Sequence, residues 1–172
     1  MYELETERTT LQLLTEEDLP AMEALAREED TFKYLRFLRV MNAEEYTKFL
    51  YTKLEQIRTG IGYHWAVRLK TNNEFIGAVN LNRIKGTDRL QIGAQLKRDY
   101  WGGGYASELM AKLVEFGIHE LRLPAVYGVF EKENNASRRL LEKLGFVFEE
   151  SFQEQEVEVE VHKYAAPGSH TA

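Results

Sequence analysis

Apolar residues recur along this chain with two different periods, and each period marks a type of element. Runs rich in β-branched and aromatic residues, bounded by turn residues, predict strands at 9–14, 63–69, 74–84, 89–96, 125–130, 146–151 and 156–164. Helical spacing of apolar residues and capping signals predict helices at 16–27, 43–59, 105–117 and 135–144. The mixed order of these elements predicts an α+β fold in which amphipathic helices pack on a sheet.

Two of the predicted helices begin with a capping box. Thr15 is followed three residues later by Asp18, and Asn42 is followed at the same spacing by Glu45. The second of these helices is predicted to end at Gly60, because glycine commonly closes a helix in the left-handed conformation. Two helices are therefore expected before the main strands of the sheet.

The last predicted strand alternates strictly between valine and glutamate. One face carries Val157, Val159 and Val161, and the other carries Glu156, Glu158 and Glu160. This pattern is typical of a half-buried strand with a solvated acidic face, and the alternative is that the glutamates border a site for a cation. The strand either lies inside the sheet or pairs with a partner chain, so the sequence allows both a monomer and a homodimer.

Length and composition restrict the classes of protein. The 172 residues suit one domain, which we expect over 1–164, with a flexible tail at 165–172. A net charge of -6 argues against binding to nucleic acid or anionic membranes. The chain has no cysteine, no apolar run approaching the roughly 20 residues of a membrane span, and no signal-peptide pattern at its N-terminus. We expect a soluble, cytoplasmic protein without disulfides or thiolate metal sites.

Three consecutive glycines, Gly102 to Gly104, separate a predicted strand from a predicted helix. Unpaired backbone N–H groups at the start of a helix form an anion site, and phosphate is its usual ligand. A Walker loop would need a lysine after the glycines, and a Rossmann fingerprint would need a parallel β-α-β unit near the start of a domain. Neither pattern fits this turn. The pattern alone also allows a flexible loop without a ligand.

The segments "IGAQLKRDYWGGGYASELM" and "ENNASRRLLEKLGF" resemble the GNAT superfamily of acyl-CoA-dependent N-acetyltransferases, in particular the branch of ribosomal-protein and small-amine N-acetyltransferases. "LQLLTEEDLPAM" and "WAVRLKTNNEFIGAVNL" support the resemblance, which covers residues 8–164. The resemblance implies a central, mostly antiparallel, twisted sheet with a splayed, bulged strand pair and helices on both faces. It also implies acetyl-CoA as cosubstrate and no metal.

The resemblance implies a role for individual residues. A segment that wraps the coenzyme A pyrophosphate in this family falls here on Trp101, Gly102, Gly103, Gly104, Tyr105, Ala106 and Ser107. Leu96 matches the position where the splayed strand bulges and its backbone pairs with the pantetheine arm, and nearby Gly93 is consistent with such a distortion. Asn134 and Ser137 match an Asn-x-x-Ser motif at the next helix, although both also suit an ordinary helix start.

The same resemblance assigns catalytic roles. Backbone N–H near Leu96 would stabilise the oxyanion, and Ser137 or a nearby tyrosine would protonate the leaving thiolate. Relatives often carry a glutamate as base where this chain has Gln91, and an amide cannot act as a base. Other candidates for the base are a glutamate of the last strand and three further residues, namely Glu131, Tyr127 and His64.

The presence of Gln91 instead of a glutamate affects the pKa that the acceptor amine can have. Deprotonating a lysine-like amine at pH 7 costs about 4.6 kcal/mol, whereas an α-amine costs about 1 kcal/mol. We therefore predict acetyl transfer to a peptide N-terminus or a small-molecule amine of low pKa, or to an amine deprotonated through bound water. Two alternatives stay open: a non-catalytic acyl-CoA sensor or interaction module, and a generic anion-binding or nucleotide-binding domain.

Overall fold

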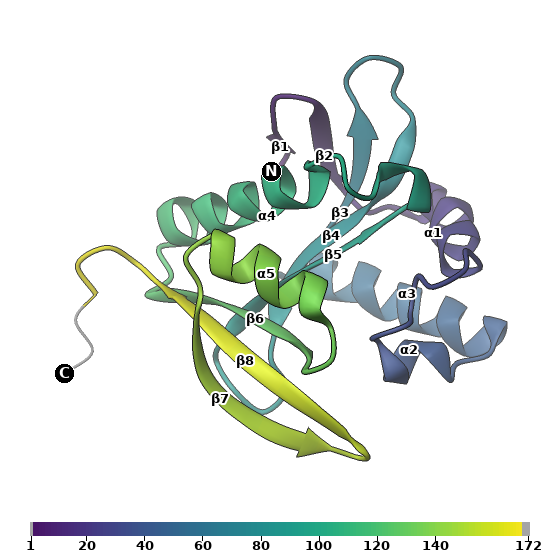
Figure 1. Cartoon of the computed structure of the whole chain (residues 1–172). Coiled ribbons are helices and arrows are strands. Elements are labelled where there is room, and N and C mark those ends of the chain that lie inside the picture. Colours follow the sequence, from purple (N-terminus) through teal and green to yellow (C-terminus); the bar gives the residue numbers. More distant parts are fainter. Residues whose placement is uncertain (1, 170–172) are drawn as a thin grey trace.

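A computed structural model describes residues 2–169 of the chain, without the side chain of Arg36. Within these residues, eight strands form one sheet in the order β1-β2-β3-β4-β5-β6-β8-β7 (Figure 1). Their bounds are β1 Leu4–Glu5, β2 Thr9–Leu13, β3 Gly62–Leu69, β4 Phe75–Arg83, β5 Leu90–Leu96, β6 Ala125–Glu131, β7 Val147–Glu154 and β8 Val157–Ala165. Neighbouring strands pair antiparallel except β5 and β6, which pair parallel. The predicted mixed fold with a mostly antiparallel sheet is confirmed.

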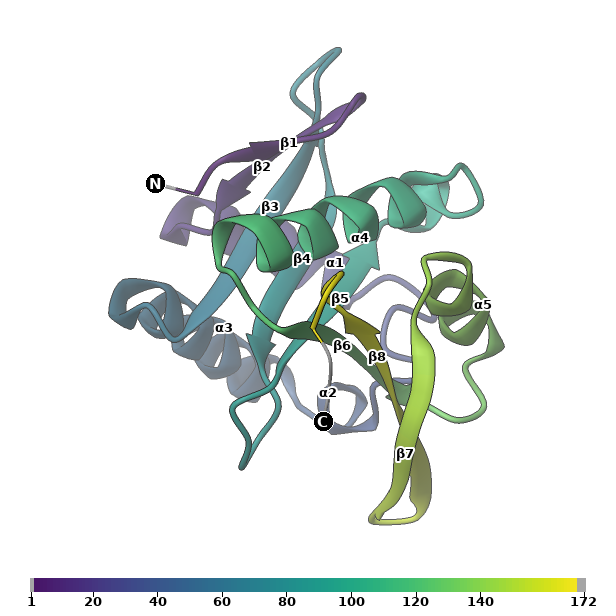
Figure 2. The same ribbon diagram turned by 90° about the vertical axis from the view of Figure 1, so that its left-hand side faces the viewer.

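Helices cover both faces of this sheet. They are α1 Leu19–Ala26, α2 Arg36–Arg39, α3 Ala43–Thr59, α4 Tyr105–Glu115 and α5 Asn135–Lys143, with short turns η1 Glu16–Asp18, η2 Arg98–Tyr100 and η3 Phe116–Glu120. Figure 2 shows α4 crossing the near face, with α1 and α3 behind the sheet. Successive side chains of β3 point to opposite faces of the sheet, so this strand contributes to two hydrophobic clusters. Trp65 packs in the cluster with α4, and Ala66 packs in the cluster with α1 and α3. None of the helices in the described part of the chain is long and apolar enough to cross a membrane.

The predicted helix caps are present. Asn42 Oδ1 accepts the Glu45 N–H at 2.8 Å, Glu45 Oε2 accepts the Asn42 N–H at 2.8 Å, and Gly60 closes α3 with φ of 72°. Asp18 Oδ2 accepts the Thr15 N–H at 2.9 Å. The caps therefore place the start of both N-terminal helical segments where the sequence predicts them.

The parallel pair of strands separates along its length. Its recorded residue pairs are Gln91 with Tyr127 and Ile92 with Gly128, although β5 continues to Leu96. The second half of β5 is therefore paired on one side only, by β4. The predicted splay is thus present between β5 and β6, on the strand that leads to the glycine turn.

The bulge lies in β4, one strand away from its expected position. β5 keeps continuous register with β4 up to the pair Gly77 and Leu96, whereas Ile76 is an extra residue of β4 opposite β3. Gly77 permits this irregularity, because a Cβ there would lie 2.2 Å from the Gln95 carbonyl oxygen. Gly93 instead makes room for the side chain of Asn80, whose Oδ1 would lie 2.9 Å from a Cβ at that position.

The last strand lies inside the sheet. β8 pairs with β6 on one side and with β7 on the other, so β7 forms the edge. The expected solvated acidic face is wrong for Glu160, which is buried beside Arg138 and His162. Ala165, the first residue of the predicted tail, belongs to β8, and the Ala166 N–H donates to the Pro124 carbonyl at 2.9 Å. Residues 170–172 of that tail lie outside the described residues.

Candidate functional site

The glycine turn joins η2 to the first residue of α4. Gly102 and Gly104 adopt φ of 76° and 83°, a left-handed conformation that glycine adopts without strain. Gly104 is the N-cap residue of α4, and Tyr105 is its first helical residue. A side chain at either left-handed position would strain the backbone, which explains why this turn is built from glycine.

A series of free backbone amides follows the turn. The Trp101 N–H donates to the Arg98 carbonyl at 3.1 Å, and the Glu108 N–H donates to the Gly104 carbonyl at 3.1 Å. Between them, no acceptor within residues 2–169 is recorded for the N–H groups of residues 102–107. These amides lie at the positive end of the α4 dipole. Their number and their position suit a ligand with several anionic oxygens, such as a pyrophosphate.

Leu96 and Trp101 lie in contact at the end of β5. The Lys97 N–H donates to the Ile76 carbonyl at 2.8 Å, so the N–H and C=O of Leu96 itself point away from β4, toward the side that β6 has left. Trp101 Nε1 donates to the Leu96 carbonyl at 2.8 Å. The carbonyl of Leu96 is thus paired with the indole of Trp101, while the backbone N–H of Leu96 faces the open side. This N–H is suited to bind an acyl or amide oxygen there.

Asn134 and Ser137 open α5, on the face of the sheet that α4 also covers. Asn134 Oδ1 accepts the Ser137 N–H at 3.1 Å, so Asn134 is the N-cap of this helix. Leu141 packs so tightly over Gly128 of β6 that a Cβ at Gly128 would lie 2.4 Å from Leu141 Cδ1. This close approach brings α5 down onto β6, beside the splayed strands, with the half-buried Ser137 in its first turn.

Gln91 lies on the opposite face of β5 from the α4 core. Its partners in the sheet are Asn82 of β4 and Tyr127 of β6. Tyr127 is buried, and the guanidinium of Arg89 lies 5.0 Å from the centre of its ring. Gln91, where the resemblance leads to an expected glutamate, therefore lies between two neutral partners, Asn82 and Tyr127, beside the point where β5 and β6 separate.

His64 is buried under α3, with 1% of its surface exposed. Its Nε2 lies 2.8 Å from Gln56 Oε1, and no partner of its Nδ1 is recorded in the described part of the chain. Burial, and then the nearby charge of Lys53, lower the pKa of His64 to about 3. At this pKa the imidazole is a weak base, which argues against His64 as the group that deprotonates an amine.

Glu160 is buried and lies in contact with Arg138 and His162. Its carboxylate accepts from Arg138 Nη2 at 2.8 Å and lies 3.0 Å from His162 Nε2. Burial raises the pKa of Glu160, but hydrogen bonds from His162 and Arg138 outweigh that effect and lower it. This glutamate is therefore an ionised partner of a helix arginine and ties α5 to β8. Glu131, another candidate for the base, lies half-buried at the end of β6.

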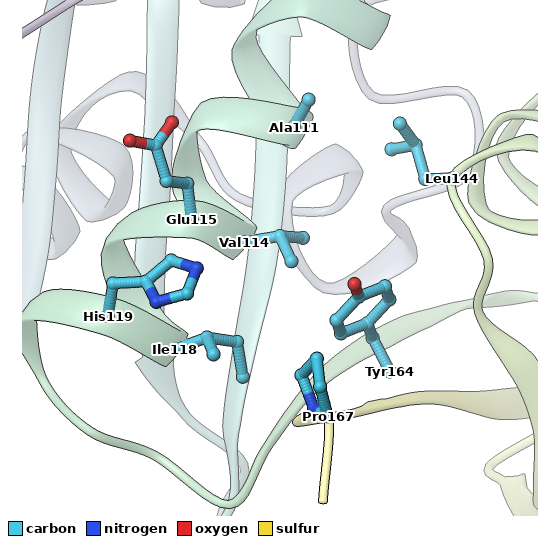
Figure 3. Close-up of a pocket in the computed structure, with 8 residues that line it drawn as sticks. All are labelled: Ala111, Val114, Glu115, Ile118, His119, Leu144, Tyr164 and Pro167. Carbon is cyan, nitrogen blue, oxygen red and sulfur yellow. The ribbon is translucent and has the colours of Figure 1, made fainter.

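A cavity of about 230 Å³ lies at the other end of α4 (Figure 3). It is lined by Ala111, Val114, Glu115, Ile118, His119, Leu144, Tyr164 and Pro167. The glycine turn is at the N-terminus of α4, whereas this cavity lies against its C-terminal half and η3. The cavity is thus distinct from the residues that the sequence predicts as the site.

Contacts that the sequence analysis missed hold the segment around the turn. The Arg98 N–H donates to Glu28 Oε2 at 2.9 Å, and the Tyr100 hydroxyl donates to Glu74 Oε2 at 2.9 Å. Arg8 Nη2 donates to the Gly103 carbonyl at 3.1 Å. These partners are 70, 26 and 95 residues away in sequence, so no local pattern could have indicated them.

Comparison with known proteins identifies the family that the sequence analysis predicted. Residues 8–147 match the acetyltransferase (GNAT) domain family. YoaA of Bacillus subtilis, named an uncharacterized N-acetyltransferase, is 28% identical over 144 residues, which cover 83% of this chain and 81% of YoaA. The uncharacterized N-acetyltransferase p20 of Bacillus licheniformis is 29% identical over 147 residues, which cover 85% of this chain and 83% of p20.

Solved structures share the fold. The ribosomal L7/L12 α-N-protein acetyltransferase RimL, solved with coenzyme A, superposes with a TM-score of 0.82 at 17% identity over 96% of this chain and 98% of RimL. A spermidine N-acetyltransferase from Vibrio cholerae, solved with coenzyme A and spermine, has a TM-score of 0.77 at 20% identity over 94% of this chain and 97% of its own. The chain belongs to the GNAT acetyltransferase family, and it is an acyltransferase.

Proposed function

We propose that this protein transfers an acetyl group from acetyl-CoA to a primary amine, either a protein or peptide N-terminus or a small-molecule amine. The observation that carries the proposal is the set of unpaired amides at residues 102–107, next to the splayed end of β5. A pyrophosphate bound by these amides would direct the thioester arm along β5, toward the Leu96 N–H. The amine would attack in a ternary complex with both substrates bound.

The reaction forms a C–N bond and breaks a C–S bond, while one proton leaves the amine and one reaches the sulfur. In this proposal the residues Trp101, Gly102, Gly103, Gly104, Tyr105, Ala106 and Ser107 hold the pyrophosphate. The Leu96 N–H donates to the carbonyl oxygen as negative charge develops on it. Asn134 maintains the start of α5 beside the cosubstrate, and the Ser137 hydroxyl protonates the leaving thiolate.

The side chains that could act as a base limit the class of amine that we propose as acceptor. Neither its amide nor the buried His64 is suited to remove a proton from a strongly basic amine. An amine of low pKa, or one that loses its proton to bound water, needs no strong base. RimL is an α-N-protein acetyltransferase by name, which is consistent with a peptide N-terminus as acceptor. The neighbour solved with spermine is a spermidine N-acetyltransferase by name, so polyamines are the contrasting class of small amine in the test. A cytoplasmic location and a homodimer stay predictions.

The test is mass spectrometry of a mixed amine pool after incubation with the protein and acetyl-CoA. The pool contains peptides with free N-termini, lysine peptides with blocked N-termini, polyamines and aminoglycosides. Acetylation confined to peptide N-termini or to small amines of low pKa is the expected result. Acetylated lysine or polyamine would contradict the expected acceptor of low pKa, and would require either a strong base or a water path that removes the proton. If no class is acetylated while coenzyme A still binds, the proposed transfer is wrong and the non-catalytic module is favoured.

A further inference from the structure

Arg8 contacts the glycine turn although the two are 95 residues apart in sequence. It lies in the short connection between β1 and β2, yet its Nη2 donates to the Gly103 carbonyl at 3.1 Å. Its guanidinium lies 3.7 Å from the centre of the Tyr105 ring, and its Nε lies 3.5 Å from Glu108 Oε1. One side chain thus contacts the turn, the first residue of α4 and the acidic residue of its first helical turn.

The hydrogen bond to Gly103 orients a neighbouring amide. The carbonyl of Gly103 and the N–H of Gly104 belong to one planar trans peptide and point in opposite directions. Because the carbonyl is held toward Arg8, the N–H of Gly104 is turned away from Arg8. Glycine loses more conformational freedom on ordering than any other residue, so three glycines in succession need an external contact to keep one conformation. Arg8 supplies that contact.

The contact with Glu108 addresses a second requirement of an anion site. A carboxylate in the first turn of α4 lies close to the free amides and would repel a phosphate. Arg8 approaches one oxygen of Glu108, and the Thr6 hydroxyl donates to the other at 3.0 Å. The segment between β1 and β2 therefore both neutralises and immobilises this carboxylate. The Arg8 side chain keeps 39% of its surface exposed, so its charge is also partly screened by solvent.

We propose that Arg8 is a positioning residue that holds the glycine turn in the conformation that binds the coenzyme A pyrophosphate. This inference rests on the proposed function. Arg8 acts through the planar geometry of its guanidinium, which donates to the Gly103 carbonyl while it stacks on Tyr105. A lysine at this position would keep the charge, but it lacks the planar group that donates a hydrogen bond at its edge while its face lies on an aromatic ring.

The test is calorimetric titration of coenzyme A and of pantetheine, which lacks the pyrophosphate, into the wild type, Arg8→Lys and Arg8→Gln. For both variants the expected result is a Kd for coenzyme A raised about tenfold, with the Kd for pantetheine unchanged. In turnover, the KM for acetyl-CoA rises by a similar factor while kcat changes less than about twofold. Arg83→Gln is the matched control, because Arg83 is exposed and lies on β4.

Each outcome bears on a different step of the inference. A wild-type Kd in Arg8→Lys would overturn it, because charge alone would then be sufficient. An equal loss of coenzyme A and pantetheine would overturn it as well, because the effect would not act through the pyrophosphate. Arg8→Lys retains the stem and the charge, so it decides the question if Arg8→Gln does not fold. If the wild type binds no coenzyme A, the proposed function is wrong and this inference falls with it.

Discussion

Lys53 is a charged side chain in the core between α3 and the sheet, and replacing it should stabilise the protein. Only 9% of its surface is exposed, and its Nζ lies 4.7 Å from the centre of the Phe49 ring. No ion pair of Lys53 is recorded within residues 2–169. Burial lowers the pKa of Lys53 from 10.5 to about 8, because removal from water disfavours the charged form.

The magnitude follows from this shift. A difference of about 2.5 pKa units corresponds to roughly 3 kcal/mol, at about 1.4 kcal/mol per unit. Below pH 8 both the folded and the unfolded chain carry the proton, so the folded state bears the full cost of the buried charge. Between pH 8 and pH 10.5 the folded state releases the proton first, and the cost disappears as the pH rises.

Urea unfolding of the wild type and of Lys53→Met at pH 7 and pH 10.5 measures this effect. At pH 7 we expect Lys53→Met to be more stable by about 2 to 3 kcal/mol, and at pH 10.5 we expect most of that difference to vanish. The control is Lys48→Met on the same helix, since the Lys48 side chain is 75% exposed and should change stability by less than about 0.5 kcal/mol. A less stable Lys53→Met, or a difference independent of pH, would refute the reasoning.

Three further predictions concern other positions. Because the pKa of His64 is about 3 in the folded state and 6.5 in the unfolded state, only the unfolded chain binds a proton at this side chain between pH 6 and pH 4. In urea titrations, the stability of the wild type relative to His64→Gln should therefore fall by about 1.4 kcal/mol for each unit by which the pH is lowered in this range. Gly128→Ala should destabilise by about 1 to 3 kcal/mol in the same assay, because its Cβ would meet Leu141; an unchanged midpoint would contradict this. Ser137→Ala should lower kcat about 100-fold with a nearly constant KM for acetyl-CoA, whereas the exposed Ser151→Ala should match the wild type.

Apart from the short β1 and α2, the strands and helices were predictable from the sequence because their signals are local. Alternation in β8 and capping at Asn42 each depend on residues within a few positions, and the structure places both where the pattern indicates. The free amides after Gly104 follow from the same logic, since the first N–H groups of any helix lack intrahelical partners and a glycine at the N-cap has no side chain to accept from them.

The bulge and the buried glutamate were not predictable in this way. Both depend on neighbouring elements of the fold: the bulge falls at Ile76 because Gly77 allows close approach to β5, and Glu160 is buried because Arg138 of α5 lies above it. A strand pattern read alone assigns the same outward face to every alternate residue, whether or not a helix covers it.

The sequence by itself determined the order of the main strands and helices, the glycine turn and the acetyltransferase family, because these depend on short-range spacing and on contiguous motifs, whereas the short β1 and α2 were not predicted. Only the tertiary structure decided that Arg8 anchors the turn, that His64 is buried beside Lys53, and that β8 lies inside the sheet. The physical reason is that these contacts join residues distant along the chain, and desolvation and hydrogen bonding act on what surrounds a group in space.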